Sequence, residues 1–205
     1  MGRIFISAGH YFRNSFDQGS GADTVIGTSE AQEMIKTRDL VVSELQSLGL
    51  VENQDFFSVP DTLNLSPTIR WINNRAISGD VALEIHGNAG GGQGAEIFHV
   101  HRNNERKRDG QRVLSAYLGK VSSLGILNRG VKPDIKPFTQ HPRLAFCRDV
   151  VIPSLLLEIC FMDSRSDMNA LTTSRLTFAR GIADGLIAFR DARGGSTPPR
   201  NTSSG

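Results

Sequence analysis

Short apolar runs of strand length alternate along this chain with longer segments in which apolar residues recur at helical spacing. Strands are predicted at residues 3–10, 54–59, 81–89, 95–100 and 153–161, with one more short strand from Ala145. Helices are predicted at residues 29–48, 65–77, 105–123 and 168–190. We therefore expect an α/β fold with a twisted mixed β-sheet of about five or six strands, flanked by helices on both faces.

The length of the chain, 205 residues, suits a single domain with one well-buried core. We place this domain at residues 1–192. Residues 193–205 are rich in glycine, proline, serine and threonine, a composition typical of a flexible tail or linker. The polar, glycine-rich stretch 11–28 is longer than an ordinary connection, which makes it a candidate functional loop. The stretch 125–143 contains three prolines and is expected to be irregular.

Composition argues against several classes of partner and location. The formal net charge of +2 gives no reason to expect a nucleic-acid partner, and the basic segment 102–112 is interpreted as the solvated start of a helix. No apolar stretch approaches the roughly 20 residues of a membrane helix, so no transmembrane segment is expected. No signal peptide is visible, because the chain enters a strand at once. Cys147 and Cys160 lack Cys-x-x-Cys spacing and are interpreted as small core residues, with a disulfide left open.

Two histidines and a glutamate stand near the ends of three predicted strands. His10 ends the first run, His86 follows the apolar residues of the run at 81–89, and Glu158 lies in a leucine-rich run. If these strands share one sheet, the three side chains converge on one rim. A histidine pair with a carboxylate is the ligand chemistry of a catalytic zinc, which keeps a fourth position for water. The sequence therefore predicts a zinc site at this rim.

Hydrolytic chemistry at such a site needs one more ligand and a separate proton carrier. Either Glu30 or Glu33, at the start of the predicted helix 29–48, could be the third zinc ligand. Glu158 is embedded among leucines, so desolvation would raise its pKa and suit it to carry a proton from water to a leaving amine. Without a partner, a glutamate in such a run costs several kcal/mol, which itself argues for a functional role.

The remaining histidines and acidic residues of interest receive structural interpretations. His99, His101 and His141 are interpreted as hydrogen-bonded structural residues rather than ligands. Glu44, and Glu33 unless it is the ligand, are interpreted as parts of solvated helix faces.

Several spaced motifs occur in a fixed order along the chain. They are Ala8-Gly9-His10, Glu84-Ile-His86-Gly-Asn88-Ala89, Arg129-Gly-Val-Lys132, Phe146-Cys-Arg148 and Pro153-Ser-Leu-Leu-Leu-Glu158-Ile-Cys-Phe161. With these motifs the chain resembles the zinc-dependent N-acetylmuramoyl-L-alanine amidases of the amidase_3 type, from Arg3 to about Phe189. The resemblance implies hydrolysis of the amide between N-acetylmuramic acid and L-alanine in peptidoglycan, with residues 1–192 as the catalytic domain, acting at the cell wall, in the periplasm or extracellularly.

The resemblance also implies roles for individual residues. It implies that a glutamate at the start of the helix, together with His10 and His86, holds Zn²⁺, and that Glu158 is the catalytic acid and base. Counting back from Gly49, Glu30 rather than Glu33 falls in the register of the family, so we choose Glu30.

The resemblance also implies two residues that bind substrate. They are Asn88 and Arg148, although the guanidinium of Arg148 could equally form an ion pair at the edge of the core.

Three residues depart from the family pattern. Tyr11 replaces the glycine after the first histidine, Glu84 replaces a serine, and Cys160 replaces a glycine. Because Glu84 alternates with apolar residues, we expect it on the same side as His86, where it could orient that ligand. Two other functions stay open on the residues alone. One is a zinc carboxypeptidase or aminopeptidase acting on peptides without sugar, and the other is a cell-wall-binding module that has lost its metal.

Overall fold

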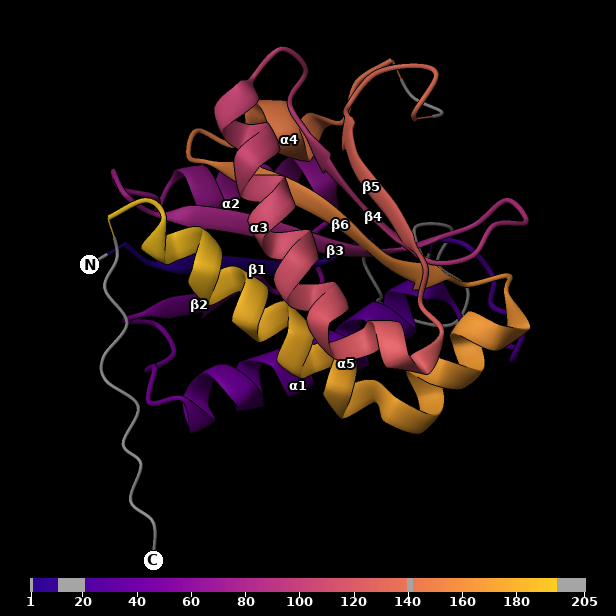
Figure 1. The fold of residues 1–205 in the computed structure, drawn as a ribbon. Helices are drawn as coiled ribbons and strands as arrows, with labels where there is room; N and C mark the ends of the chain where they lie inside the picture. Colours follow the sequence, from indigo (N-terminus) through magenta and orange to yellow (C-terminus); the bar gives the residue numbers. More distant parts are fainter. Residues whose placement is uncertain (1, 11–20, 140–141, 195–205) are drawn as a thin grey trace, which may run out of the picture.

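The computed structural model describes residues 2–10, 21–139 and 142–194. Six strands and five α-helices follow one another along this part of the chain, mostly in alternation (Figure 1). Their bounds are β1 Ile4–Ala8, α1 Glu30–Ser47, β2 Phe56–Ser58, α2 Leu65–Asn73, β3 Val81–Asn88, β4 Ala95–His99, α3 Asn104–Val121, β5 Asn128–Pro133, α4 Ala145–Asp149, β6 Ser154–Phe161 and α5 Arg165–Asp191, with a short 3₁₀ helix at Ser122–Leu124.

The strands form one mixed sheet in the order β2-β1-β3-β6-β4-β5. Strands β2, β1, β3 and β6 run parallel to one another, β4 runs antiparallel to β6, and β5 runs parallel to β4. The carboxyl ends of β1, β3 and β6 therefore meet at one edge of the sheet. The predicted α/β fold with a mixed sheet of about five or six strands is confirmed.

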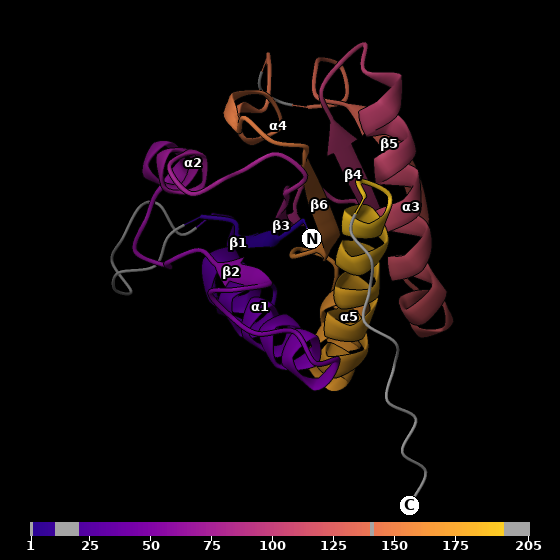
Figure 2. The ribbon, with the colours of Figure 1, turned by 90° about the vertical axis from the view of Figure 1, so that its left-hand side faces the viewer.

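Helices cover both faces of the sheet (Figure 2). Helices α1, α3 and α5 pack on one face, where the larger hydrophobic core includes Leu83 and Ile85 of β3 and Leu155 and Leu157 of β6. Helices α2 and α4 lie on the other face. Because side chains alternate along a strand, the residues between these apolar ones point toward α2 and α4. This alternation directs the polar side chains of β3 and β6 to the face that is covered by the two short helices α2 and α4.

Two local predictions are wrong. The segment from Ala145 forms helix α4 and not a strand. Phe146 and Cys147 are neighbours in sequence and both are buried against the same face of the sheet, an arrangement that a helical turn allows and a strand does not. The stretch 125–143 was expected to be irregular but contains strand β5, which lies at the edge of the sheet, where proline and a bulge at Arg129 are tolerated.

Three further expectations concern cysteines, membrane helices and the tail. Cys147 and Cys160 are both buried and free. Among the described residues, no helix combines the length and the apolar character needed to cross a bilayer. Helix α5 ends at Asp191, one residue before the predicted end of the domain. Most of the predicted tail, residues 195–205, lies outside the described residues, as do residues 11–20 of the predicted functional loop.

Candidate metal centre

Three side chains from separate elements converge at the carboxyl edge of the sheet. His10 follows β1, His86 lies in β3, and Glu30 is the first residue of α1. Their candidate ligand atoms lie within 4.8 Å of one another, so the group could hold a metal ion. The two imidazole rings meet edge to face, with centroids 5.0 Å apart. The predicted convergence of two strand-end histidines with a helix-opening glutamate is thus present in the fold.

The Glu30 carboxylate lies between the two imidazoles. Its Oε2 is 3.1 Å from Nε2 of His10, and its Oε1 is 2.9 Å from Nδ1 of His86. Backbone N–H groups fix the carboxylate further, since Gly87 donates to Oε1 at 3.0 Å and Ala22 donates to Oε2 at 3.1 Å. A carboxylate held by four donors keeps one orientation before any ligand arrives.

The start of α1 explains why Glu30 occupies this position. Ser29 is the N-cap of the helix, and a capping box with Gln32 fixes the first turn. The helix therefore begins at Glu30, whose side chain is 5% exposed.

Two glycines allow the histidines and the glutamate to approach so closely. A Cβ on Gly9 would lie 2.4 Å from Cε1 of His86, and a Cβ on Gly21 would lie 2.5 Å from Oε2 of Glu30. His10 itself adopts a φ of 65°, in the left-handed region that only a few per cent of non-glycine residues occupy. The backbone around the three side chains is therefore shaped to place them in contact.

The contacts between these groups shift their pKa values in opposite directions. Burial alone would raise the pKa of Glu30, but hydrogen bonds with His10 and His86 outweigh it and hold that pKa well below its usual range. Burial alone would lower the pKa of His86, but hydrogen bonds with Glu30 and Glu84 outweigh it and raise that pKa well above its usual range. In the metal-free protein these opposite shifts describe one ion pair, between the anionic carboxylate of Glu30 and the protonated imidazole of His86.

Glu158 lies beside this group on the neighbouring strand. It pairs directly with His86 in the parallel register of β3 and β6. The residue is half-buried, yet its Oε2 is buried and is one of the atoms without a hydrogen-bond partner among the described residues. Burial raises the pKa of Glu158 to about 8. A carboxyl group with this pKa can both accept and release a proton near neutral pH.

Sequence reasoning missed a second group of charges next to Glu158. Glu96 in β4 pairs with Glu158 across the antiparallel register, and its buried carboxylate accepts from Arg129 at 2.6 Å and from Lys132 at 2.5 Å. Asn88 donates to the other oxygen of Glu96 at 3.0 Å. The Arg-Gly-Val-Lys motif was visible in the sequence, but its acidic partner lies more than 30 residues away.

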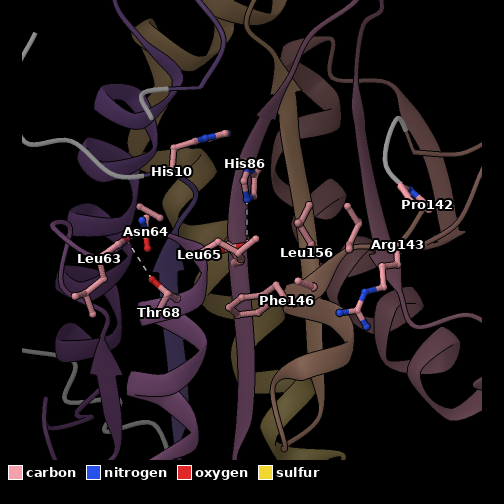
Figure 3. A pocket seen from close by; sticks show the side chains of 14 residues that line it. His10, Leu63, Asn64, Leu65, Thr68, His86, Pro142, Arg143, Phe146 and Leu156 are labelled. Atoms are coloured by element: carbon pink, nitrogen blue, oxygen red, sulfur yellow. Dashed lines mark hydrogen bonds and ion pairs between the residues drawn. The ribbon is translucent and has the colours of Figure 1, made fainter. Parts of the chain in front are cut away.

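Two cavities meet at the histidines. The carboxylate cavity has a volume of about 300 Å³. Its lining includes His10, Glu30, His86, Asn88, Glu96, Phe138 and Glu158. The apolar cavity, of about 500 Å³, lies between α2 and α4 (Figure 3). His10 and His86 border it on one side, and Leu63, Leu65, Phe146 and Leu156 surround it.

Other predicted residues take different places. Glu33 is not a solvated residue, as had been expected, because its side chain is 1% exposed and pairs with Arg175 of α5 and Lys36. Arg148 forms a bidentate ion pair with the buried Asp134, at 2.5 and 2.8 Å, which is the structural alternative left open by the sequence.

The other histidines lie apart from the group that could hold a metal. His99 is buried, with Nδ1 2.9 Å from the carbonyl of Val100. His101 follows strand β4, and its backbone N–H donates to Asp134. His141 and Tyr11 lie outside the described residues.

The residues present fit a divalent cation. Two imidazoles and one carboxylate form the usual three-ligand set of a catalytic metal site with an open position. Glu158 lines the same cavity, and its buried Oε2, without a hydrogen-bond partner among the described residues, could receive a proton from a bound water molecule.

Comparisons with known proteins place the chain in a family. The family model Amidase_3, described as N-acetylmuramoyl-L-alanine amidase, matches residues 4–188. The sporulation-specific N-acetylmuramoyl-L-alanine amidase of Bacillus subtilis is 27% identical over 191 residues, which is 91% of this chain and 67% of that protein.

Solved structures share the fold. An N-acetylmuramoyl-L-alanine amidase from Clostridium difficile 630 superposes with a TM-score of 0.73 at 19% identity, covering 93% of this chain and 97% of that one. The catalytic domain of CwlV from Bacillus (Paenibacillus) polymyxa superposes with a TM-score of 0.72 at 21% identity, covering 93% and 99% of the two chains. At these identities, the similarity to solved structures supports the fold and nothing further.

Proposed function

This chain belongs to the Amidase_3 family of N-acetylmuramoyl-L-alanine amidases, and we propose that it is a zinc enzyme that cuts stem peptides from the glycan strands of peptidoglycan. The bond hydrolysed is the amide between N-acetylmuramic acid and the L-alanine of the stem peptide. The observation that carries the proposal is that Glu158, whose buried Oε2 has no hydrogen-bond partner in the described part of the chain, stands in register with His86 on the adjacent strand.

In this proposal His10, Glu30 and His86 hold the zinc ion. Their three ligand atoms are already gathered within 4.8 Å. Zinc, when bound, would supply Lewis acidity that polarises the amide carbonyl and makes water a better nucleophile. The backbone donors of Gly87 and Ala22 keep the Glu30 carboxylate in place, so little reorganisation is needed when substrate arrives.

Glu158 moves the proton. As a carboxylate it accepts a proton from the attacking water, and as a carboxylic acid it gives that proton to the leaving nitrogen of L-alanine. Its raised pKa keeps both forms accessible near neutral pH. Glu96 lies next to it, and Arg129 and Lys132 balance the charge of Glu96 itself.

Substrate contacts are assigned to the cavity walls. Asn88 lines the carboxylate cavity, where we propose that it contacts the muramyl peptide. Arg148 is not among the residues that line either cavity and uses Nε and Nη2 to bind Asp134, so the substrate contact that the resemblance implies would have to use Nη1. We further propose that residues 1–192 form the catalytic domain and that the enzyme acts at the cell wall, on the outer side of the membrane.

The proposal is tested with the wild-type protein and His86→Ala. We expect one zinc per wild-type chain by mass spectrometry and release of stem peptides from sacculi, with both lost in the variant. Cleavage of a muramyl peptide but not of the free stem peptide separates an amidase from a carboxypeptidase or aminopeptidase. Binding to sacculi without zinc and without cleavage would instead identify a wall-binding module and refute the proposal.

A further inference from the structure

A second carboxylate contacts the imidazole of His86 on the side away from Glu30. Glu84 lies two residues before His86 in β3, so both side chains point to the same face of the sheet. Its Oε2 is 3.1 Å from Nε2 of His86, whereas Glu30 lies against Nδ1. Both nitrogens of this ring are therefore in contact with a carboxylate.

The Glu84 side chain is fixed in this position. It is 6% exposed, and its Oε1 accepts a hydrogen bond from Ser7 of the neighbouring strand at 3.4 Å. Residues 7 and 84 pair directly in the parallel register of β1 and β3. The sheet itself therefore positions the carboxylate, and a buried carboxylate without a functional partner would be costly.

The contact with Glu84 determines which ring nitrogen of His86 keeps a proton. A carboxylate can only accept a hydrogen bond, so its contact with Nε2 requires a proton on that nitrogen. Nδ1 faces the carboxylate of Glu30, so in the metal-free protein that contact needs a proton on Nδ1 as well. A metal ion bound at Nδ1 would replace this proton and leave the Nε2 proton in place. A hydrogen-bond acceptor behind a histidine ligand fixes the tautomer and the ring orientation, and makes the ligating nitrogen more basic.

We propose that Glu84 is a positioning residue that holds His86 in the Nε2–H tautomer and thereby strengthens metal binding at Nδ1. The inference rests on the proposed function, because it requires that His86 is a zinc ligand. It concerns a residue at which this chain departs from the family pattern, which has serine at this position.

The experiment measures zinc affinity by competition with a chelator for the wild type, Glu84→Gln and Glu84→Ala. We expect Glu84→Ala to bind zinc about 10- to 100-fold more weakly than the wild type, the usual cost of losing such a partner. Glu84→Gln should fall between them, since its amide oxygen still accepts from Nε2–H but carries no charge. Glu44→Gln is the matched control, because it removes the same charge at a site on α1 paired with Arg180, and it should leave the affinity unchanged.

A second readout separates positioning from a general effect on folding. In the zinc-loaded wild type, nitrogen-15 NMR should place the His86 proton on Nε2, and in Glu84→Ala the exchange of that proton with water should be faster. Thermal unfolding of the metal-free variants checks that each one folds.

The possible results are distinct. Zinc affinity of Glu84→Ala equal to that of the wild type would overturn the inference while leaving the proposed function intact. A wild type that binds no zinc would overturn both.

Discussion

Glu158→Gln tests both the proposed chemistry and the electrostatics of the cavity. Glutamine has the same shape as glutamate, so the substitution leaves no cavity between β3 and β4, but an amide cannot carry the proton. Loss of a general acid and base lowers turnover by about 10²- to 10⁴-fold, which corresponds to about 3 to 5 kcal/mol of transition-state free energy. Zinc content should stay at the wild-type value, because Glu158 is not among the three residues proposed as ligands.

The same substitution has a predictable effect on the stability of the metal-free protein. The pKa of Glu158 is about 8 in the folded state and near 4.5 in the unfolded chain. Between these values the unfolded chain has lost the proton that the folded protein keeps, so a rise in pH favours unfolding. The wild type should therefore lose stability from about pH 4.5 to pH 8, relative to Glu158→Gln. Each tenfold step in proton affinity is about 1.4 kcal/mol, so the whole effect is several kcal/mol at most.

The assay combines three measurements on the wild type and the variant. They are stem-peptide release from sacculi, zinc content by mass spectrometry, and urea unfolding of the metal-free proteins at pH 5 and pH 8. The expected pattern is an inactive variant that holds zinc and gains stability relative to the wild type at pH 8. Wild-type turnover in the variant would refute the catalytic role. A stability difference that is equal at both pH values would refute the electrostatic argument.

Three further substitutions give separate tests. Glu30→Gln should abolish stoichiometric zinc binding measured by mass spectrometry, whereas Glu33→Gln should leave zinc bound and lower only the free energy of unfolding. Arg148→Met leaves the buried Asp134 without its ion pair and should cost about 3 kcal/mol at pH 7 in urea unfolding. Arg148 holds the pKa of Asp134 below its ordinary value of 3.8, so this difference should shrink as the pH falls below about 4. Gly9→Ala should weaken zinc binding in chelator competition and cost about 1 to 3 kcal/mol, because the added methyl group overlaps the neighbouring imidazole.

The sequence contained enough to predict the edge of the sheet where the site forms. His10, His86 and Glu158 follow or interrupt apolar runs, and parallel strands bring such residues to one edge. The helix predicted at residues 29–48 placed Glu30 in its first turn, which is where the structure has it. Features set by local pattern were therefore accessible without a structure.

Features that depend on residues far apart in the sequence could not be predicted. Glu33 looked like a surface residue because its ion-pair partner Arg175 lies 142 positions away, on the helix that packs against α1. Helix α4 was taken for a strand because a five-residue element has too few positions to reveal its period. Glu96 lies in the strand predicted at residues 95–100 and was not singled out from the sequence. It comes to lie beside Glu158 only through the pairing of β4 with β6.

Charge balance connects the separate parts of this site. Four glutamate side chains gather around one rim, and Arg129 and Lys132 pair with that of Glu96. Glu30 and Glu84 bracket His86, and with neutral imidazoles they leave two negative charges in a mostly buried region. In the metal-free protein this charge is partly offset by a proton on His86, whose pKa is raised well above its usual range by the two carboxylates. A divalent cation offsets the charge more fully, but it needs the Nδ1 lone pair and must displace that proton. The carboxylate behind the ring therefore serves both states, because it accepts from Nε2–H whether Nδ1 holds a proton or faces a metal.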